Sequence, residues 1–154
     1  MMDPVGTFRT TMAIENVAHR GEMRTVEDAL VDTGSEFTWV PRAVLEAIGI
    51  EPERRQQFVV ARGSYGRRLE RSVGFALVHA AGTNAPDFVV FAEPGDMVIL
   101  GARSLEGLNV RVDAQRKQLI PAGPILAGSV RVRADLSEDS APALAASRVP
   151  PRTR

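Results

Sequence analysis

The residues best suited to chemistry in this chain are Asp32, Thr33, Gly34 and Ser35, which follow the apolar run 29–31. An aspartate at the end of a buried strand can act as a general acid or base, because the strand fixes the position of its carboxylate. The three residues after it are small, and such residues form a tight turn that leaves room for a second carboxylate and a water molecule. The same sequence is also typical of an ordinary surface turn, so the motif alone leaves both interpretations open.

A second element lies further along the chain, where the apolar run 97–100 leads into Gly101. The segment that follows carries Leu105 and Leu108 at a spacing that places them on one side of a short helical turn. An apolar strand, a glycine and a short helix in this order predict a closing element for a small barrel.

The segment 57–78 predicts a β-hairpin with a mobile tip. The tip residues, which lie between two strand-prone runs, are Arg62, Gly63, Ser64, Tyr65 and Gly66. Two glycines give a tip the backbone freedom that a lid needs to close over a bound peptide. A plain surface hairpin has the same pattern, and it is the aspartate motif that favours the lid.

In their order and spacing these elements resemble the retropepsin-like aspartic proteases, the single-domain homodimeric relatives of pepsin. The resemblance covers residues 6–120 and rests on four segments. Residues 30–35 are similar to the catalytic loop, residues 39–50 to the strand and short helix after it, residues 58–78 to the flap hairpin, and Ile99, Leu100 and Gly101 to the glycine motif beside the catalytic loop. The implied fold is all-β, a small closed acid-protease barrel with one or two short helices and one pepsin-like lobe per chain.

The resemblance also implies an activity, that of an aspartic endopeptidase acting on an extended peptide or protein. Asp32 would be catalytic, and because one motif makes half of a site, a homodimer would supply the second carboxylate. The pair would share one proton, so that one carboxylate activates water while the other stabilises the oxyanion. Thr33 would brace the two loops across the dimer, Gly34 would admit the substrate backbone, and Ser35 would bond the outer oxygen of Asp32. No metal or other cofactor is implied.

This chain departs from the viral members of that family at two places near the motif. Glu36 and Phe37 stand where those proteins carry an acidic pair, and Ala102 follows Gly101 where they commonly carry arginine. We therefore expect the contacts to the substrate backbone to differ, while the paired aspartates are kept.

Two other interpretations also fit the sequence. One is a retropepsin-like domain that binds extended peptides or dimerises without cleaving anything, since a fold does not guarantee an activity. The other is an unrelated small β-barrel, acting as an interaction module, in which the tripeptide arose by chance.

Composition bounds the remaining possibilities. The chain has 154 residues, 44% of them hydrophobic, which is typical of one soluble globular domain. With 19 basic and 19 acidic residues, it has no net charge that would favour nucleic acid or an anionic membrane. The absence of cysteine excludes disulfides and thiolate catalysis. The two histidines, His19 and His79, are far apart in the sequence, and we expect surface or strand positions for them rather than a metal site.

We expect two regions along the chain. Residues 1–121 form the protease domain, and residues 122–154 form a C-terminal extension rich in proline, alanine and arginine that is partly disordered. The amino terminus lacks the pattern of a signal peptide, and no apolar run is long enough for a membrane span. A cytoplasmic protein without membrane partners is therefore the expectation.

Overall fold

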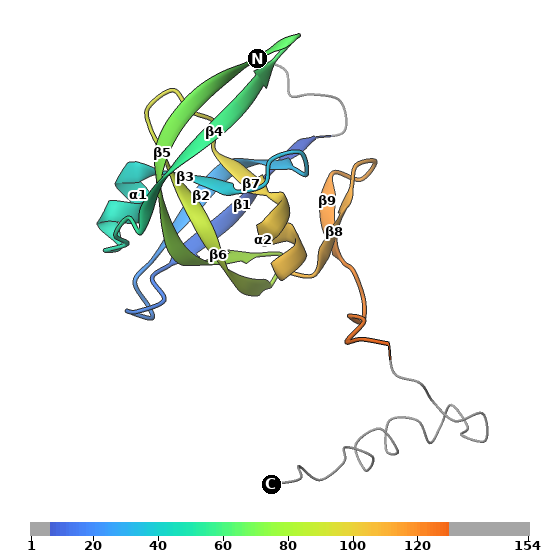
Figure 1. Cartoon of the computed structure of the whole chain (residues 1–154). Coiled ribbons are helices and arrows are strands. Elements are labelled where there is room, and N and C mark those ends of the chain that lie inside the picture. The colour runs from blue at the N-terminus through green and yellow to red at the C-terminus, as the bar shows by residue number, and fades with distance from the viewer. Residues whose placement is uncertain (1–6, 130–154) are drawn as a thin grey trace, which may run out of the picture. The chain divides into compact units, whose positions relative to one another are not determined.

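The computed structural model of the chain describes residues 7–129, apart from the side chain of Arg62. These residues form nine strands and two short helices (Figure 1). The strands are β1 (Phe8–Glu15), β2 (Met23–Asp32), β3 (Thr38–Pro41), β4 (Arg54–Arg62), β5 (Tyr65–Ala80), β6 (Thr83–Ala92), β7 (Ile99–Gly101), β8 (Val110–Asp113) and β9 (Gln118–Pro121). The helices are α1 (Arg42–Ala47) and α2 (Ala102–Gly107). The predicted all-β class with short helices is confirmed.

Seven of these strands form one sheet in the order β1-β2-β7-β3-β6-β5-β4, and β1 also pairs with β5. This extra pairing closes the sheet into a barrel, as predicted. The closure is possible because β5 has 16 residues: its first part pairs with β4, and its second part pairs with β6 and β1. The β4–β5 hairpin therefore projects from the barrel, as Figure 1 shows.

The strands bury apolar side chains in two separate clusters. Successive residues of a strand point to opposite faces, so neighbours in sequence belong to different clusters. Val31, Val40 and Leu100 belong to the larger cluster, the interior core, with Phe91 and Leu45. We call the smaller one the outer cluster, and its buried members are Leu30, Trp39, Val73, Val90, Ala92 and Ile99.

Both helices cover the interior core with a few leucines. In α1 the buried residue is Leu45, and the chain leaves the helix through Gly49, whose φ of 75° suits glycine. Leu105 of α2 and Leu108, the residue directly after it, are both buried in the interior core, which confirms that they lie on one side.

One predicted boundary was wrong. The strand expected at residues 97–100 begins at Ile99 and ends at Gly101. Its pairing with β2 begins at Ile99, opposite Leu30. In the turn before it, the carboxylate of Asp96 accepts a hydrogen bond from the backbone N–H of Glu93 at 2.8 Å, and the N–H of Asp96 donates to the Glu93 carbonyl at 2.9 Å. These bonds close the turn at residues 93–96.

Chain contacts divide the molecule into residues 1–123 and residues 124–154. The first unit contains the barrel and a two-stranded sheet of β8 and β9, whose side chains Val110, Val112 and Leu119 pack against the interior core. Of the second unit the structure describes residues 124–129, which form no helix or strand. Most of the predicted extension 122–154 lies outside the described residues.

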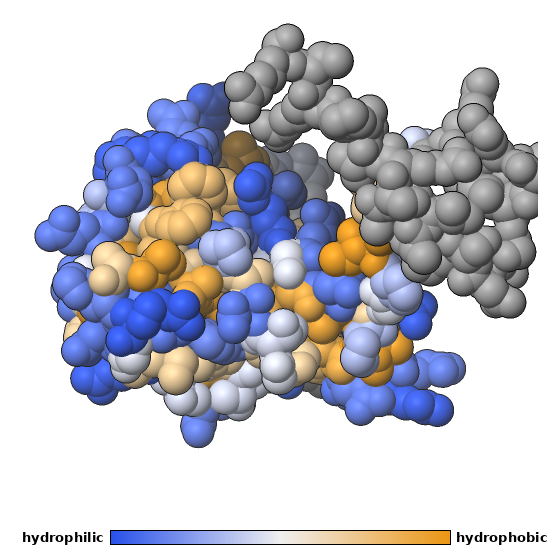
Figure 2. Space-filling model, turned by 90° about the horizontal axis from the view of Figure 1, so that it is seen from below, coloured by the Kyte–Doolittle hydropathy of each residue, from blue (hydrophilic) through white to orange (hydrophobic). Residues whose placement is uncertain are grey.

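On the face of the molecule drawn in Figure 2, apolar side chains form small patches between hydrophilic ones. Within residues 7–129, none of the helices has the length and apolar character needed to cross a lipid bilayer. The amino-terminal residues for which we expect no signal peptide lie outside the described residues.

Candidate active site

Asp32 is the last residue of β2, and the sheet places it beside Gly101. The two strands β2 and β7 run parallel with Val31 opposite Leu100 and Asp32 opposite Gly101. On its other side β7 pairs antiparallel with β3, through Trp39 and Ile99. Because β7 is thus inserted between two strands that are consecutive in sequence, the loop between β2 and β3 must cross the end of β7.

Backbone hydrogen bonds fix this crossing loop to the start of α2. The N–H of Ala102 donates to the carbonyl of Ser35 at 2.7 Å, and the N–H of Arg103 donates to the carbonyl of Glu36 at 3.1 Å. These N–H groups belong to the first turn of a helix, where no partner within the helix exists for them. The loop carbonyls therefore supply acceptors for the N–H groups at the start of α2, and the same two bonds fix the position of the loop.

Each oxygen of the Asp32 carboxylate accepts one hydrogen bond from the loop itself. The hydroxyl of Ser35 donates to Oδ2 at 2.7 Å, and the N–H of Gly34 donates to Oδ1 at 2.9 Å. The bond implied for Ser35 by the family resemblance is thus present. Asp32 is half-buried, whereas Thr33 and Gly34 are exposed. The carboxylate is held in one orientation and remains accessible from solvent.

Glycine at position 101 is required by the closeness of the crossing loop. A Cβ added there would lie 2.3 Å from the carbonyl oxygen of Phe37 and 2.9 Å from that of Ser35. Its two predecessors point to opposite faces, because Ile99 belongs to the outer cluster and Leu100 to the interior core. In this three-residue motif, Gly101 therefore lets the loop pass close to β7, while Ile99 and Leu100 fix β7 in the apolar clusters on the two faces of the sheet.

A chain of buried polar side chains fastens the same region from inside. The N–H of Gly101 donates to Thr38 Oγ1 at 3.0 Å, and Ser104 Oγ donates to Asp87 Oδ2 at 2.7 Å. Thr38 Oγ1 and Ser104 Oγ lie 2.6 Å apart. Since the single hydroxyl hydrogen of Ser104 goes to Asp87, Thr38 is the donor between them. This chain links β7, β3, α2 and β6, and sequence reasoning missed it because nothing marks these hydroxyls within apolar segments.

The outer cluster lies on the face of the sheet that carries Asp32. Leu30 and Asp32 are two residues apart on β2 and so point to the same face. Phe37 packs against the cluster, and the rings of Phe37 and of the cluster member Trp39 both contact Phe58 of β4, with centroids 5.6 Å and 5.1 Å away respectively. The β4–β5 hairpin is therefore joined to the active-site loop through aromatic side chains. The alternation of apolar residues in the sequence indicates that such a cluster exists. The strand register is needed to assign it to the face of the sheet that carries Asp32.

The turn at the tip of the predicted flap is shorter than the five residues expected for it. Arg62 pairs with Tyr65, so Gly63 and Ser64 form a two-residue loop, in which Gly63 has a φ of 58°. The expectation that Gly66 adds backbone freedom was wrong, because it lies within β5, and its φ is not positive. Its lack of a side chain instead makes room across the strands, where an added Cβ would lie 2.6 Å from Val59 Cγ1.

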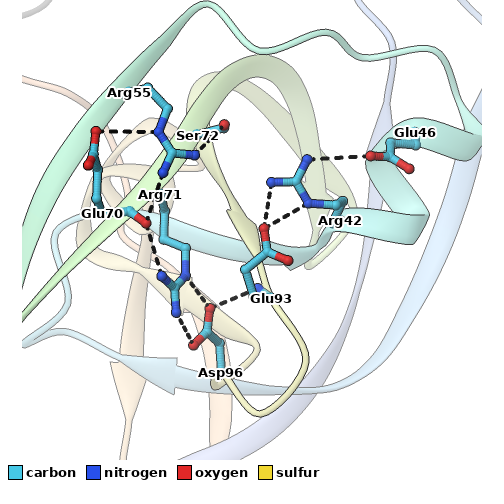
Figure 3. Close-up of polar contacts among 8 residues, drawn as sticks. All are labelled: Arg42, Glu46, Arg55, Glu70, Arg71, Ser72, Glu93 and Asp96. Atoms are coloured by element: carbon cyan, nitrogen blue, oxygen red, sulfur yellow. Dashed lines mark hydrogen bonds and ion pairs between the residues drawn. The ribbon is translucent and has the colours of Figure 1, made fainter.

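Ion pairs hold the turn 93–96 that leads into β7 (Figure 3). The guanidinium of Arg71 binds both oxygens of Asp96, at 2.7 Å and 2.9 Å, and the hydrogen bond from Arg71 is the main reason that the pKa of Asp96 is lowered. Arg42 of α1 donates through Nε to Glu93 at 2.8 Å, and this bond is the main cause of the lowered pKa of Glu93. Both ends of the turn are thereby tied to neighbouring elements.

The histidines lie apart from Asp32. His19 is exposed in the turn between β1 and β2, and His79 Nε2 lies 2.8 Å from Glu15 Oε1. Within the described range, no three His, Cys, Asp or Glu side chains are grouped so that they could hold a metal ion.

Comparison with known protein families identifies the family of this chain. The profile of a family described as aspartyl protease matches residues 16–104, more than half of the chain. The matched range contains the Asp32 loop, the β4–β5 hairpin, β7 and the start of α2. No curated protein is detectably similar in sequence to this chain.

Proposed function

Because this chain belongs to the retropepsin-like aspartyl protease family, we propose that it is an aspartic endopeptidase that acts as a homodimer through Asp32 of each subunit. The observation that carries the proposal is the Asp32 carboxylate, which is half-buried at the end of β2 and held by bonds from Ser35 and Gly34. A general base needs such a fixed position within reach of its substrate. Each chain has one such aspartate motif, so a two-fold axis through the loops completes the site.

In this dimer Asp32 and Asp32 of the partner subunit lie close together. Because two carboxylates at such a distance repel each other, the two groups share one proton. The ionised carboxylate takes a proton from a water molecule, whose oxygen then attacks the carbonyl carbon of the peptide bond. The protonated carboxyl donates a hydrogen bond to the carbonyl oxygen and stabilises the charge that develops there. When the C–N bond breaks, a carboxyl proton passes to the leaving nitrogen, and the pair again holds one proton.

The substrate in this proposal is an extended peptide that lies between the two subunits under the β4–β5 hairpins. Exposed backbone at Thr33 and Gly34 suits contact with the partner loop and with a peptide backbone. The hairpin tip, with its flexible Gly63, serves as the lid. The mechanism uses side chains of the two subunits and a water molecule.

Asp32→Asn tests the catalytic role directly. We expect the purified wild-type protein to cleave members of a peptide library, detected by mass spectrometry, and the variant to lose about a thousandfold in rate or more, because an amide cannot act as the base. Asp28→Asn is the matched control, since Asp28 is an exposed aspartate on the same strand. Full cleavage by a folded Asp32→Asn variant would refute the proposal. A wild-type protein that binds peptides without cleaving them would favour the non-catalytic alternative.

Mixed subunits test the dimer. When equal amounts of wild-type and Asp32→Asn chains exchange freely, random pairing leaves roughly a quarter of the dimers with two aspartates. Activity per total chain should then fall to about a quarter of the wild-type value, whereas an active monomer would keep about half. Light scattering on the same samples measures whether dimers exist at the assay concentration.

A further inference from the structure

The β4–β5 hairpin is strongly basic in a chain that has no net charge. Residues 54–71 contain six of the 19 basic residues and a single acidic one, Glu70. The six are Arg54, Arg55, Arg62, Arg67, Arg68 and Arg71. Glu70 pairs with Arg55 at 3.4 Å. The hairpin therefore carries an excess of positive charge that its own residues do not neutralise.

Strand register divides these arginines between the two faces of the hairpin. Residues directly opposite each other in an antiparallel pair share a face. The pairs Phe58–Leu69 and Val60–Arg67 follow each other along one face, and the pairs Val59–Arg68 and Gln57–Glu70 along the other.

The first of these faces is the one that looks toward the active-site loop. Phe58 and Leu69 pack against the outer cluster, which shares its face of the sheet with Asp32. Following the same face toward the tip, the next pair is Val60 and Arg67. Arg67 therefore lies on the inner face of the proposed lid, whereas its neighbour Arg68 lies on the outer face.

Arg67 has a charge available for a ligand. Within the described part of the chain, its side chain is exposed and makes no hydrogen bond or ion pair. Arg71 on the same face is already occupied by Asp96, which it binds through both carboxylate oxygens. The pKa of Asp96 is lowered chiefly by that bond from Arg71, and the charge of Arg67 adds a smaller contribution.

We propose that Arg67 selects peptide substrates that carry an aspartate or glutamate side chain near the scissile bond. This inference rests on the proposed function, which places the peptide under the hairpin. Because a two-fold axis would supply one Arg67 from each subunit, the acidic preference should occur on both sides of the scissile bond. Val60 and Phe58 on the same face favour apolar side chains at adjacent positions.

Two pools of synthetic octapeptides test this proposal. They have the same apolar centre and differ in carrying glutamate or lysine at the flanking positions. For the wild-type protein we expect kcat/KM to be about fivefold higher for the glutamate pool, the upper end of what one solvent-accessible charge pair provides. The preference should weaken between 50 mM and 500 mM salt, since salt screens exposed charges.

Charge reversal on each face of the hairpin supplies the matched variants. Arg67→Glu should invert the preference, and Arg68→Glu, with the same change of net charge one residue away, should keep it. Arg67→Gln should abolish the preference without inverting it. Thermal unfolding of the three variants shows whether each is folded, and we expect it to be nearly unchanged because both positions are exposed.

Binding by the Asp32→Asn variant decides the inference even if no peptide is cleaved. Fluorescence polarisation with one labelled peptide of each pool should show tighter binding of the glutamate peptide, and this difference should disappear in Asp32→Asn/Arg67→Gln. Cleavage without charge preference would overturn the inference and leave the proposed function standing. Equal effects of the Arg67 and Arg68 changes would overturn it too. So would tight binding of a labelled single-stranded RNA probe together with indifference to peptide charge, which would identify the hairpin as a polyanion-binding arm.

Discussion

At the scale of single residues, the candidate site depends on how one carboxylate is held. Asp32 receives one donor at each oxygen, and both donors come from its own loop. That loop is in turn fixed by the first turn of α2 and by the close approach of Gly101. A hydroxyl that bonds a catalytic base fixes the orientation of that base. Removal of the hydroxyl should therefore affect turnover more than folding.

The first prediction concerns Ser35→Ala. Loss of the bond to Oδ2 frees the Asp32 carboxylate to rotate, so we expect kcat to fall about tenfold while KM changes little. The free energy of unfolding, measured by urea denaturation, should change by less than about 1.5 kcal/mol, the usual net value of one hydrogen bond. Ser35→Thr keeps the hydroxyl and should retain most of the activity. A Ser35→Ala enzyme with wild-type kcat would show that this bond has no part in positioning.

At the scale of elements, the sequence predicted what depends on local patterns. The aspartate loop, the short helix with Leu105 and Leu108, and the β4–β5 hairpin all have signals within a few residues. The start of β7 was misplaced by two residues, because its pairing with β2 begins only at Ile99, opposite Leu30. Gly66 was misinterpreted because its role is to make room for a residue on the opposite strand.

Features that combine distant strands could not be read from the sequence alone. The bonds among Thr38, Ser104 and Asp87 join residues from three elements. The placement of Arg67 on the inner face of the hairpin depends on its register with Val60. Alternation shows that successive residues face opposite ways, but pairing across strands is needed to say which way.

The second prediction tests the hairpin as a moving lid through Gly63→Val. Gly63 and Gly82 both lie in two-residue turns with positive φ, at 58° and 76°, and an added Cβ would meet nothing within 4 Å at either position. Valine should therefore impose a similar backbone strain of about 1–2 kcal/mol in each variant, measured by urea denaturation. Turnover should fall severalfold in Gly63→Val because the stiffened tip closes poorly over substrate. Equal turnover in Gly63→Val and Gly82→Val would show that this hairpin is not the lid.

At the scale of the whole molecule, the proposed shared proton requires a fold that persists on the acidic side of neutrality. One cluster that contributes to this lies far from Asp32 and links β1, the turn after it and β5. Glu15 Oε2 accepts the N–H of Gly21 at 2.8 Å and lies 3.1 Å from Arg20 Nε, while Oε1 lies 2.8 Å from His79 Nε2. These partners, with the Gly21 bond as the largest contribution, lower the pKa of Glu15 from 4.5 to about 2.

The last prediction follows from that lowered pKa and its sign. A carboxyl group with a lower pKa in the folded state stabilises the protein above its unfolded value of 4.5, and the contribution is lost as pH falls toward about 2. Glu15→Gln should therefore be less stable than the wild type at pH 7, and the difference between the two free energies of unfolding should shrink steadily between pH 4.5 and pH 2. Glu22→Gln, a change at an exposed residue of the same turn, should show no such convergence. Urea denaturation at a series of pH values measures all three proteins. If wild type and Glu15→Gln lost stability in parallel across this range, the bonds of Glu15 to Gly21, Arg20 and His79 would not contribute to the stability of the fold in acid.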